Sequence, residues 1–268
     1  MTEAAPSDTD TAELAVSLRD VTKTYDNGVM ALGPIDLSVR RGEFVSLLGP
    51  SGCGKSTALR IIAGLAAPTT GSVVVAHHDE ASLPGQGIGF VFQEPTLMPW
   101  TSARENVRLP LRLAHLPALQ SDPRVLEALT RVGLTEFAES YPRELSGGMK
   151  MRVSLARALV TDPDILLMDE PFAALDEITR FRLNNDLIAL WRKLNKTVIF
   201  VTHSVFESVY LSQRVIVMTQ RPGRIGAEIR IDTPEPRSED FRTSVAYGEY
   251  CRKVSAALAP SYEGRATL

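Results

Sequence analysis

The stretch Gly49-Pro50-Ser51-Gly52-Cys53-Gly54-Lys55-Ser56-Thr57 decides how the rest of the chain is organised. Residues 44–48 before it are typical of a short buried strand, and residues 58–63 after it are typical of the start of a helix that Gly64 closes. Between a strand and a helix, the pattern G-x-x-x-x-G-K-[ST] forms a cradle for phosphate groups. Its glycines let successive backbone N–H groups face an anion, and the helix N-terminus adds partial positive charge. The stretch therefore predicts a nucleotide-binding loop, in which Lys55 reaches the outer phosphates and the Ser56 hydroxyl binds Mg²⁺.

Composition is that of a soluble globular protein without a nucleic-acid partner. The 268 residues are 44% hydrophobic and 23% charged, with a net charge of -3 and a pI of about 5.9, so no basic field favours nucleic acid. No uninterrupted apolar run approaches the ~20 residues of a membrane span. Residues 1–10 lack the apolar core of a signal peptide, and Cys53 and Cys251 cannot form a disulfide framework. We therefore expect a cytosolic protein.

Strand and helix patterns alternate along most of the chain. Residues 15–18 and 35–39 alternate apolar with polar side chains, on either side of the turn signal Asp26-Asn27-Gly28, which predicts a small antiparallel β-subdomain. Later strand–helix–strand units, with the wholly apolar run 165–168 as one strand, predict a mainly parallel sheet. The expected fold class is therefore α/β.

Three further regions differ from this pattern. Between about residues 94 and 162, Leu, Ala, Arg and Glu dominate with helical periodicity, which indicates an inserted helical subdomain within a domain of residues 14–230. Residues 1–13 have the composition of a disordered segment. Residues 231–268 read as a linker and a helical tail, which we expect to pack against the core through an apolar stripe formed by Tyr247, Cys251, Val254 and Leu258.

Two acidic residues follow the central apolar strand. Ligands of an open parallel sheet bind beyond the carboxyl ends of its strands, so these carboxylates should lie at the predicted phosphate site. An unpaired Asp169 there would cost several kcal/mol, and we expect it to hold Mg²⁺ through Ser56 and water. Glu170 precedes Pro171, which should favour an extended backbone at Glu170 and project its carboxylate towards the attacking water.

Gln93 and His203 follow two further predicted strands. His203 is placed to contact the γ-phosphate, and Gln93 to contact the metal or the water. A lone Gln or His at a strand end is more commonly a cap or a surface residue, but the phosphate loop favours the site. The remaining histidines have no such context and are expected at the surface: His77, His78 and His115.

One short stretch identifies a family. Leu145-Ser146-Gly147-Gly148-Met149 opens a predicted helix that Ser146 caps. In order with the phosphate loop, Gln93, residues 165–170, Ala174-Leu175-Asp176 and His203, it resembles the ATP-binding-cassette ATPases from about Leu14 to Ile225. It is the specific marker, because other phosphate-loop ATPases lack it.

The resemblance implies a core of the RecA-like phosphate-loop NTPase type and an ATPase that uses ATP and Mg²⁺. Glu170, His203 and Gln93 would be catalytic, and Ser56, Gln93 and Asp169 would hold the metal. Tyr25, which the residues alone assign to packing more readily than to a ligand, would stack on adenine. Two copies would dimerise head to tail, with each ATP between the phosphate loop of one and residues 146–149 of the other.

A narrower resemblance concerns transport. Leu97-Met98-Pro99-Trp100 with Glu105-Asn106-Val107, and the stretch 221–225, look like importers of the nitrate, sulfonate and taurine group. Membership would place the chain at the cytoplasmic face of the plasma membrane, docked on transmembrane permease subunits near Gln93 and indirectly linked to a substrate-binding protein. Trp100 would line that dock or, equally well, fill the core of the helical subdomain.

Three other functions stay open from sequence. An exporter or lipoprotein-release ATPase would carry the same motifs. A non-transport ATPase acting on DNA or the ribosome is disfavoured by the acidic pI and by the absence of a coiled-coil insertion. A cassette that binds ATP without hydrolysing it is opposed by Glu170 and His203.

Overall fold

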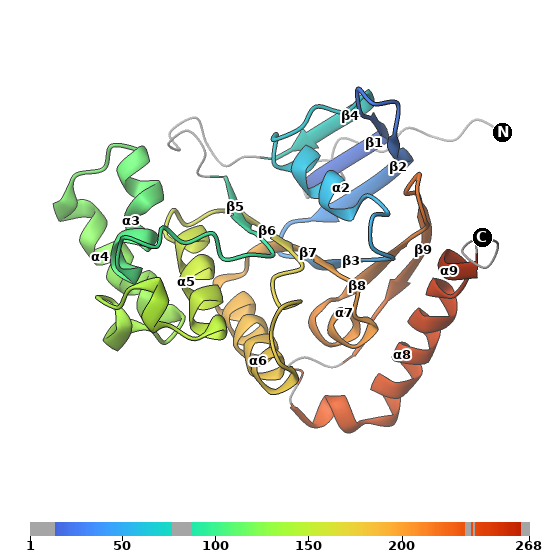
Figure 1. Cartoon of the computed structure of the whole chain (residues 1–268). Coiled ribbons are helices and arrows are strands. Elements are labelled where there is room, and N and C mark those ends of the chain that lie inside the picture. Colours follow the sequence, from blue (N-terminus) through green and yellow to red (C-terminus); the bar gives the residue numbers. More distant parts are fainter. Residues whose placement is uncertain (1–13, 77–86, 234–236, 238, 264–268) are drawn as a thin grey trace.

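A six-stranded sheet forms the centre of the protein, in the order β5-β6-β7-β3-β8-β9 (Figure 1). The computed structural model describes residues 14–76, 87–233, 237 and 239–263. All neighbouring strands of this sheet are parallel except the edge strand β9, which runs antiparallel to β8. The predicted α/β class with a mainly parallel sheet is confirmed. The strands are β3 (Phe44–Leu48), β5 (Ile88–Val91), β6 (Ile165–Asp169), β7 (Thr197–Thr202), β8 (Arg214–Met218) and β9 (Ile225–Arg230).

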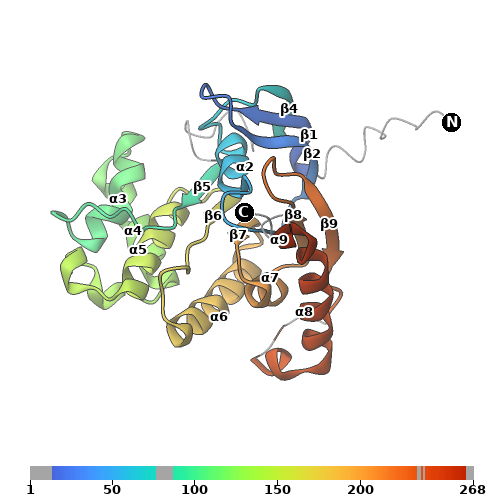
Figure 2. The ribbon, with the colours of Figure 1, turned by 45° about the vertical axis from the view of Figure 1, so that its right-hand side comes forward.

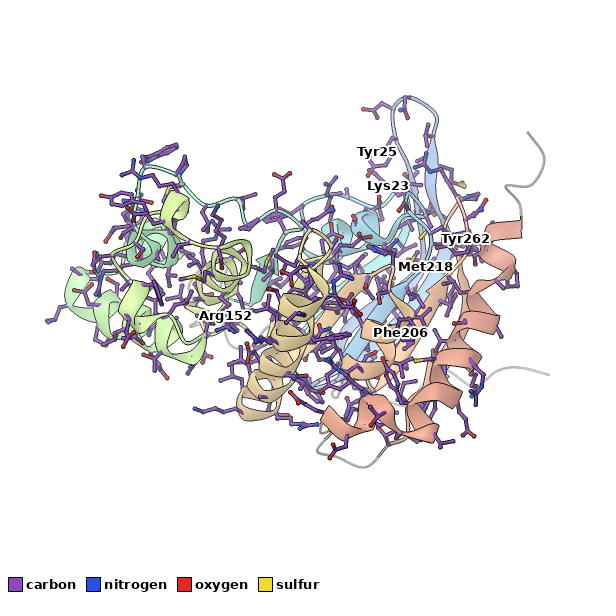
Figure 3. The ribbon with its side chains drawn as sticks, turned by 60° about the horizontal axis from the view of Figure 1, so that its bottom comes forward. Lys23, Tyr25, Arg152, Phe206, Met218 and Tyr262 are labelled. Carbon is purple, nitrogen blue, oxygen red and sulfur yellow. The ribbon has the colours of Figure 1, made fainter. Side chains whose placement is uncertain are left out.

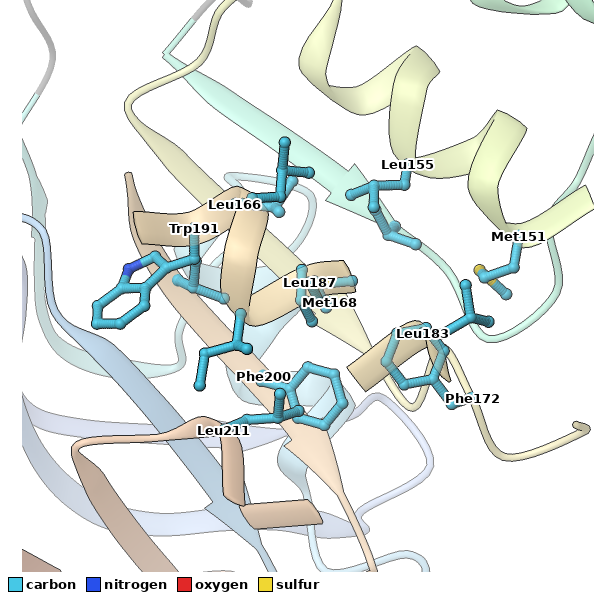
Figure 4. Close-up of a cluster of buried hydrophobic side chains, with 14 of the residues drawn as sticks. Met151, Leu155, Leu166, Met168, Phe172, Leu183, Leu187, Trp191, Phe200 and Leu211 are labelled. Carbon is cyan, nitrogen blue, oxygen red and sulfur yellow. The ribbon is translucent and has the colours of Figure 1, made fainter. Parts of the chain in front are cut away.

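Both faces of the sheet are covered, which is why its central strands are mostly apolar. Successive side chains of a strand point to opposite faces, so Phe44 and Leu48 join one buried cluster while Val45 and Leu47 join another. The second cluster lies under α2 (Lys55–Ile62) and the first under α6 (Glu177–Leu194) and α7 (Val205–Leu211). Figure 4 shows the first cluster, where the Phe200 ring centroid lies 5.8 Å from that of Phe172.

A separate antiparallel sheet lies beside α2, as the alternating sequence predicts. It consists of β1 (Leu14–Thr24), β2 (Met30–Arg40) and β4 (Thr70–Val75) in the order β2-β1-β4. The β1–β2 connection contains Asp26-Asn27-Gly28, and Gly28 has a φ of 78°. Both β1 and β2 are longer than their alternating segments, because register shifts let pairing continue where strict alternation is lost.

Three helices project to one side of the main sheet (Figures 1 and 2). They are α3 (Ala103–Leu113), α4 (Ala118–Arg131) and α5 (Gly147–Leu159). Sequence alone starts α4 at Arg124, but the helix begins six residues earlier with Pro123 inside it. Proline removes one backbone hydrogen bond, and the helix tolerates this loss in its second turn. Short helical turns complete this part of the chain: η1 (Thr135–Phe137) and η2 (Pro142–Glu144).

The C-terminal tail packs against the chain's own core. It contains η3 (Glu239–Thr243), α8 (Val245–Leu258) and α9 (Pro260–Glu263), and α8 runs alongside α7 and β9 (Figure 2). The predicted apolar stripe is confirmed, since its four members are buried: Tyr247, Cys251, Val254 and Leu258. None of the helices in the described ranges has the length and apolarity to cross a membrane.

Arg237 ties this tail to α7. Its side chain is buried, and Nη1 donates to the carbonyl oxygens of Val209, Tyr210 and Ser212 at 3.2, 2.9 and 2.8 Å. The last carbonyls of a helix have no partner within the helix. Arg237 therefore caps the C-terminal end of α7 from a distant part of the chain.

We predict that Arg237→Met lowers the free energy of unfolding by about 3 kcal/mol, because it leaves carbonyls at the end of α7 without a buried donor. Urea unfolding followed by circular dichroism measures the change. Arg252→Met, the same substitution at an exposed position of α8, is the control. Equal midpoints for the two variants would contradict the capping role.

Candidate functional site

A depression of about 560 Å³ lies where the phosphate loop, the β1–β2 turn and the ends of the central strands meet. It brings together residues that are far apart in the sequence. Its lining consists of Tyr25, Asn27, Val29, Ala31, Ser51, Gly52, Gly54, Lys55, Ser56, Thr57, Gln93, Glu170 and Arg221. Gln93, which sequence places at a strand end, is thus next to the phosphate loop.

The phosphate loop needs its glycines. Gly52 and Gly54 have φ values of 77° and 102°, in the left-handed region that favours glycine. A Cβ on Gly54 would lie 2.6 Å from Leu32 Cδ2 and 2.7 Å from the Ala31 carbonyl oxygen. The helix α2 starts at Lys55, earlier than sequence predicts, so its free N–H groups adjoin the loop directly. The Cys53 thiol is buried beneath the loop, and burial raises its pKa.

Lys55 carries a buried positive charge at the floor of the loop. Its side chain is 3% exposed, and Nζ donates to the carbonyl oxygens of Gly49 at 2.8 Å and Pro50 at 2.9 Å. The Glu170 carboxylate lies 3.6 Å away. A cation with so little water around it attracts an anionic ligand strongly, because the surroundings screen it weakly.

Ser56 and Asp169 form the oxygen-rich part of the site. Ser56 Oγ donates to Asp169 Oδ1 at 2.8 Å. Burial raises the pKa of Asp169, while the hydrogen bond from Ser56 acts in the opposite direction. Hydroxyl and carboxylate oxygens are the donors that Mg²⁺ prefers, with phosphate and water completing its shell. Ser56 and Asp169 therefore fit a metal that is bound together with a nucleotide.

Glu170 connects Lys55 to His203, the histidine that the sequence assigns to the site. His203 Nδ1 lies 3.0 Å from Glu170 Oε2, and the imidazole is 47% exposed. Sequence reasoning expected Pro171 to keep Glu170 extended, and this is wrong, since Glu170 has a φ of 45°. Its N–H donates to the Val201 carbonyl while its own carbonyl accepts from Ala173 N–H, so a tight turn fixes the backbone. A residue other than glycine in this region is strained, and such strain concentrates at active sites.

Tyr25 lies at the rim of the depression, over the start of α2. Its hydroxyl is 3.2 Å from Thr57 Oγ1, and Lys23 Nζ lies 5.4 Å from the ring centroid on one face (Figure 3). One face of the ring therefore holds a cation, and the opposite face is the one on which a planar base can stack.

Sequence reasoning missed Arg221 as part of the site. Its Nε donates to the Gly52 carbonyl at 3.2 Å. The loop that carries it packs tightly on the phosphate loop, since a Cβ on Gly223 would lie 1.9 Å from the Cys53 carbonyl oxygen. The only sequence signal was an arginine beside glycine and proline, far along the chain from the residues it contacts.

Ser146-Gly147-Gly148-Met149 does not line this depression. Ser146 caps α5 as predicted, accepting from Met149 N–H at 3.3 Å, and both Ser146 and Gly147 are exposed. Gly148 is buried against α6, where a Cβ would lie 2.8 Å from Thr179 Cγ2. Within one chain, this stretch and the phosphate loop are parts of different surfaces.

A family model described as "ABC transporter" matches residues 32–173. The chain belongs to the ABC transporter family. It is 47% identical to an uncharacterized ABC transporter ATP-binding protein of Methanocaldococcus jannaschii over 91% of both chains. It is 41% identical to the aliphatic sulfonates import ATP-binding protein SsuB of Bacillus cereus, over 90% of this chain and 94% of the relative. It is 42% identical to the nitrate import ATP-binding protein NrtD of Synechocystis, over 86% of this chain and 88% of the relative.

Solved structures give the same assignment. A dimeric ATP-binding cassette in a post-hydrolysis state, bound to ADP and Pi, matches with a TM-score of 0.70 and 38% identity, over 82% of this chain and 100% of that chain. The cbiO1 cassette from Clostridium perfringens matches with a TM-score of 0.74 and 27% identity over 92% of this chain and 97% of that chain. The chain is therefore an ATP-binding subunit of an ABC transporter and an ATPase, with the predicted phosphate-loop NTPase fold.

We predict that Gly223→Ala weakens ATP binding about tenfold, because the added methyl group forces the Arg221 loop away from the phosphate loop. Titration with a fluorescent ATP analogue measures the dissociation constant. Gly248→Ala is the control, since the nearest atom to its Cβ would be Arg252 Nη1 at 3.8 Å. An unchanged dissociation constant in Gly223→Ala would mean that the contact between the two loops does not shape the site.

Proposed function

We propose that the chain is the ATP-hydrolysing subunit of an ABC importer, which dimerises head to tail on ATP and drives a membrane permease for a small anionic or zwitterionic solute such as nitrate, a sulfonate or taurine. The observation that carries the hydrolytic part is the position of Glu170, between the buried Lys55 ammonium at 3.6 Å and the His203 imidazole at 3.0 Å. The importer part is supported by the relatives named for sulfonate and nitrate import.

Several residues in and beside the depression then have chemical tasks. The phosphate loop and Lys55 hold the β- and γ-phosphates, Arg221 adds positive charge beside Gly52, and Tyr25 stacks on adenine with its free face. Glu170 accepts a proton from the attacking water, and His203 orients Glu170 and contacts the γ-phosphate. Mg²⁺, held by Ser56 with Asp169 and Gln93, would neutralise charge on the phosphate oxygens.

Residues 146–149 require a second copy to take part. The exposed Ser146 and Gly147 at the start of α5 offer donors suited to a phosphate, but they lie outside the chain's own depression. A head-to-tail dimer would bring this helix start to the ATP of the partner copy. A related cassette solved as a dimer with ADP and Pi supports this arrangement.

The permease would dock on the surface around Gln93 and Trp100, with the chain peripheral at the cytoplasmic face of the membrane. Trp100 is 73% exposed, so the alternative that it fills the core of the helical subdomain is wrong. Arg157 of α5 holds the segment between Gln93 and Trp100. Its guanidinium group donates hydrogen bonds to the carbonyl oxygens of Pro95 at 2.8 Å and Thr96 at 2.9 Å. This link connects the proposed dock to the helix that starts with the Ser-Gly-Gly stretch. An exporter or lipoprotein-release system is the second candidate, since it would use the same catalytic residues.

We predict that Glu170→Gln lowers the rate of ATP hydrolysis by about 100-fold or more, because the water loses its proton acceptor. The variant should also form a dimer with ATP on sizing chromatography, whereas the wild type stays mostly monomeric. Glu249→Gln, at an exposed position of α8, is the control. Undiminished hydrolysis in Glu170→Gln would show that another group activates the water.

We predict that Trp100→Ala keeps the ATPase rate of the isolated chain within about twofold, but loses co-purification with the permease subunits that accompany the wild type from membranes. An exposed aromatic anchor contributes much of the energy of an interface. Leu119→Ala is the control, since Leu119 is 88% exposed on α4 and is not one of the residues assigned to the dock. Equal recovery of permease with both variants would place the dock elsewhere.

A further inference from the structure

Glu207 is a buried carboxylate to which the proposed hydrolysis gives no task. It lies in the first turn of α7, and its side chain is 9% exposed. Burial raises the pKa of Glu207, while a hydrogen bond from Thr202 and the positive charge of Arg180 act in the opposite direction. A carboxylate is costly to bury unless such partners surround it. The identity of these partners therefore indicates what Glu207 holds in place.

On one side, Glu207 holds the segment that carries His203. Its Oε2 accepts a hydrogen bond from Thr202 Oγ1 at 2.6 Å, and Thr202 directly precedes His203. The same hydroxyl oxygen accepts a hydrogen bond from the N–H of Ser204 at 3.0 Å. Ser204 Oγ in turn accepts from the N–H of Glu207 at 3.3 Å. The residues on both sides of His203 are thus connected to one buried carboxylate.

On the other side, Arg180 connects Glu207 to the turn that follows Glu170. Arg180 Nε lies 3.7 Å from Glu207 Oε1, and Arg180 Nη2 donates to the Leu175 carbonyl oxygen at 3.0 Å. The turn starts at Glu170, whose carbonyl oxygen accepts from the N–H of Ala173. Arg180 is on α6, which lies beside α7 (Figures 1 and 2). The far end of the turn is therefore held by the pair Arg180–Glu207.

These contacts form a closed ring, because His203 Nδ1 lies 3.0 Å from Glu170 Oε2. The His203 imidazole is 47% exposed, so water competes for that contact. Thr202 and Glu207 are buried, so water does not compete in the same way for the hydrogen bond between them. The buried half of the ring is thus suited to fix the distance between the exposed imidazole and the Glu170 carboxylate.

We propose that Glu207 and Arg180 are positioning residues for ATP hydrolysis, which hold His203 and the turn after Glu170 in register. This role rests on the proposed function, in which His203 orients Glu170. Glu207 and Arg180 do not line the nucleotide depression. Loss of their contacts should therefore lower kcat and leave the KM for ATP unchanged, because a small displacement of a catalytic group costs a large factor in rate.

Steady-state ATP hydrolysis by Thr202→Val tests the link to His203. Valine is close to threonine in shape but has no hydroxyl group, so the substitution removes the hydrogen bonds with Glu207 and Ser204. We expect kcat to fall at least about tenfold, with the KM for ATP within about twofold of the wild type. Thr202→Ser keeps the hydroxyl group and should keep kcat within about threefold of the wild type.

Thr197→Val is the matched control for Thr202→Val. Thr197 is also buried, lies at the other end of β7, and accepts a hydrogen bond from the N–H of Gly42 at 3.0 Å. This variant loses a hydrogen bond of the same kind from the same strand, so it measures the effect of lost stability alone. We expect it to keep kcat within about twofold of the wild type, and urea unfolding compares the stabilities of the two valine variants.

A double-mutant cycle tests the pair itself. Arg180→Met removes the cation, and Glu207→Gln removes the negative charge but keeps an oxygen that can accept from Thr202. Each should lower kcat at least about fivefold, and the double variant should lose little more than either single variant, because both changes remove the same interaction. Arg180→Met decides the matter if Thr202→Val fails to fold, since the Arg180 side chain is only partly buried.

The inference is overturned if Thr202→Val keeps the kcat of Thr197→Val, if the losses appear in KM instead of kcat, or if the two losses of the cycle multiply in the double variant. Glu170→Gln, measured in the same series, separates this failure from failure of the proposed function. An undiminished rate in Glu170→Gln would contradict the proposed function, and the positioning role with it. A slow Glu170→Gln beside a fast Thr202→Val would contradict the positioning role alone.

Discussion

The buried ammonium group of Lys55 is the constraint on which the nucleotide site depends. Removing such a charge from water is costly unless hydrogen bonds and opposite charge surround it. The Gly49 and Pro50 carbonyls and the Glu170 carboxylate supply that surrounding. The loop must therefore curve back over its own lysine, which only glycine-compatible backbone angles allow. The same curvature presents the N–H groups of α2 to an incoming phosphate.

The fold followed from the sequence because its decisive signals are local. A wholly apolar strand, a glycine-rich loop and a helix are each encoded within a few residues, and the buried parallel sheet requires that order. For the same reason Gln93 and Glu170, both expected at strand ends, line one depression, and His203 contacts Glu170. Their assignment to the site needed only the rule that parallel strands end at one edge.

What escaped sequence reasoning depends on contacts between distant segments. Arg221 reaches Gly52 across 169 residues because a loop after β8 packs on the phosphate loop, and no local pattern encodes that packing. The backbone at Glu170 is held by a hydrogen bond to Val201 on a neighbouring strand, which outweighs the local preference that Pro171 imposes.

The short helix α7, which follows the proposed catalytic residue His203, depends for its stability on residues outside the nucleotide site. It starts two residues after His203 and is only seven residues long, too short to persist without support from outside. Tyr247 donates to the carbonyl of Phe206 near its beginning, and Arg237 holds its end. The helix that follows the histidine is thus stabilised by Tyr247 and Arg237, although none of the described residues after residue 231 lines the nucleotide depression. The unit that supports hydrolysis therefore extends beyond the recognisable motifs and includes Arg237 and Tyr247.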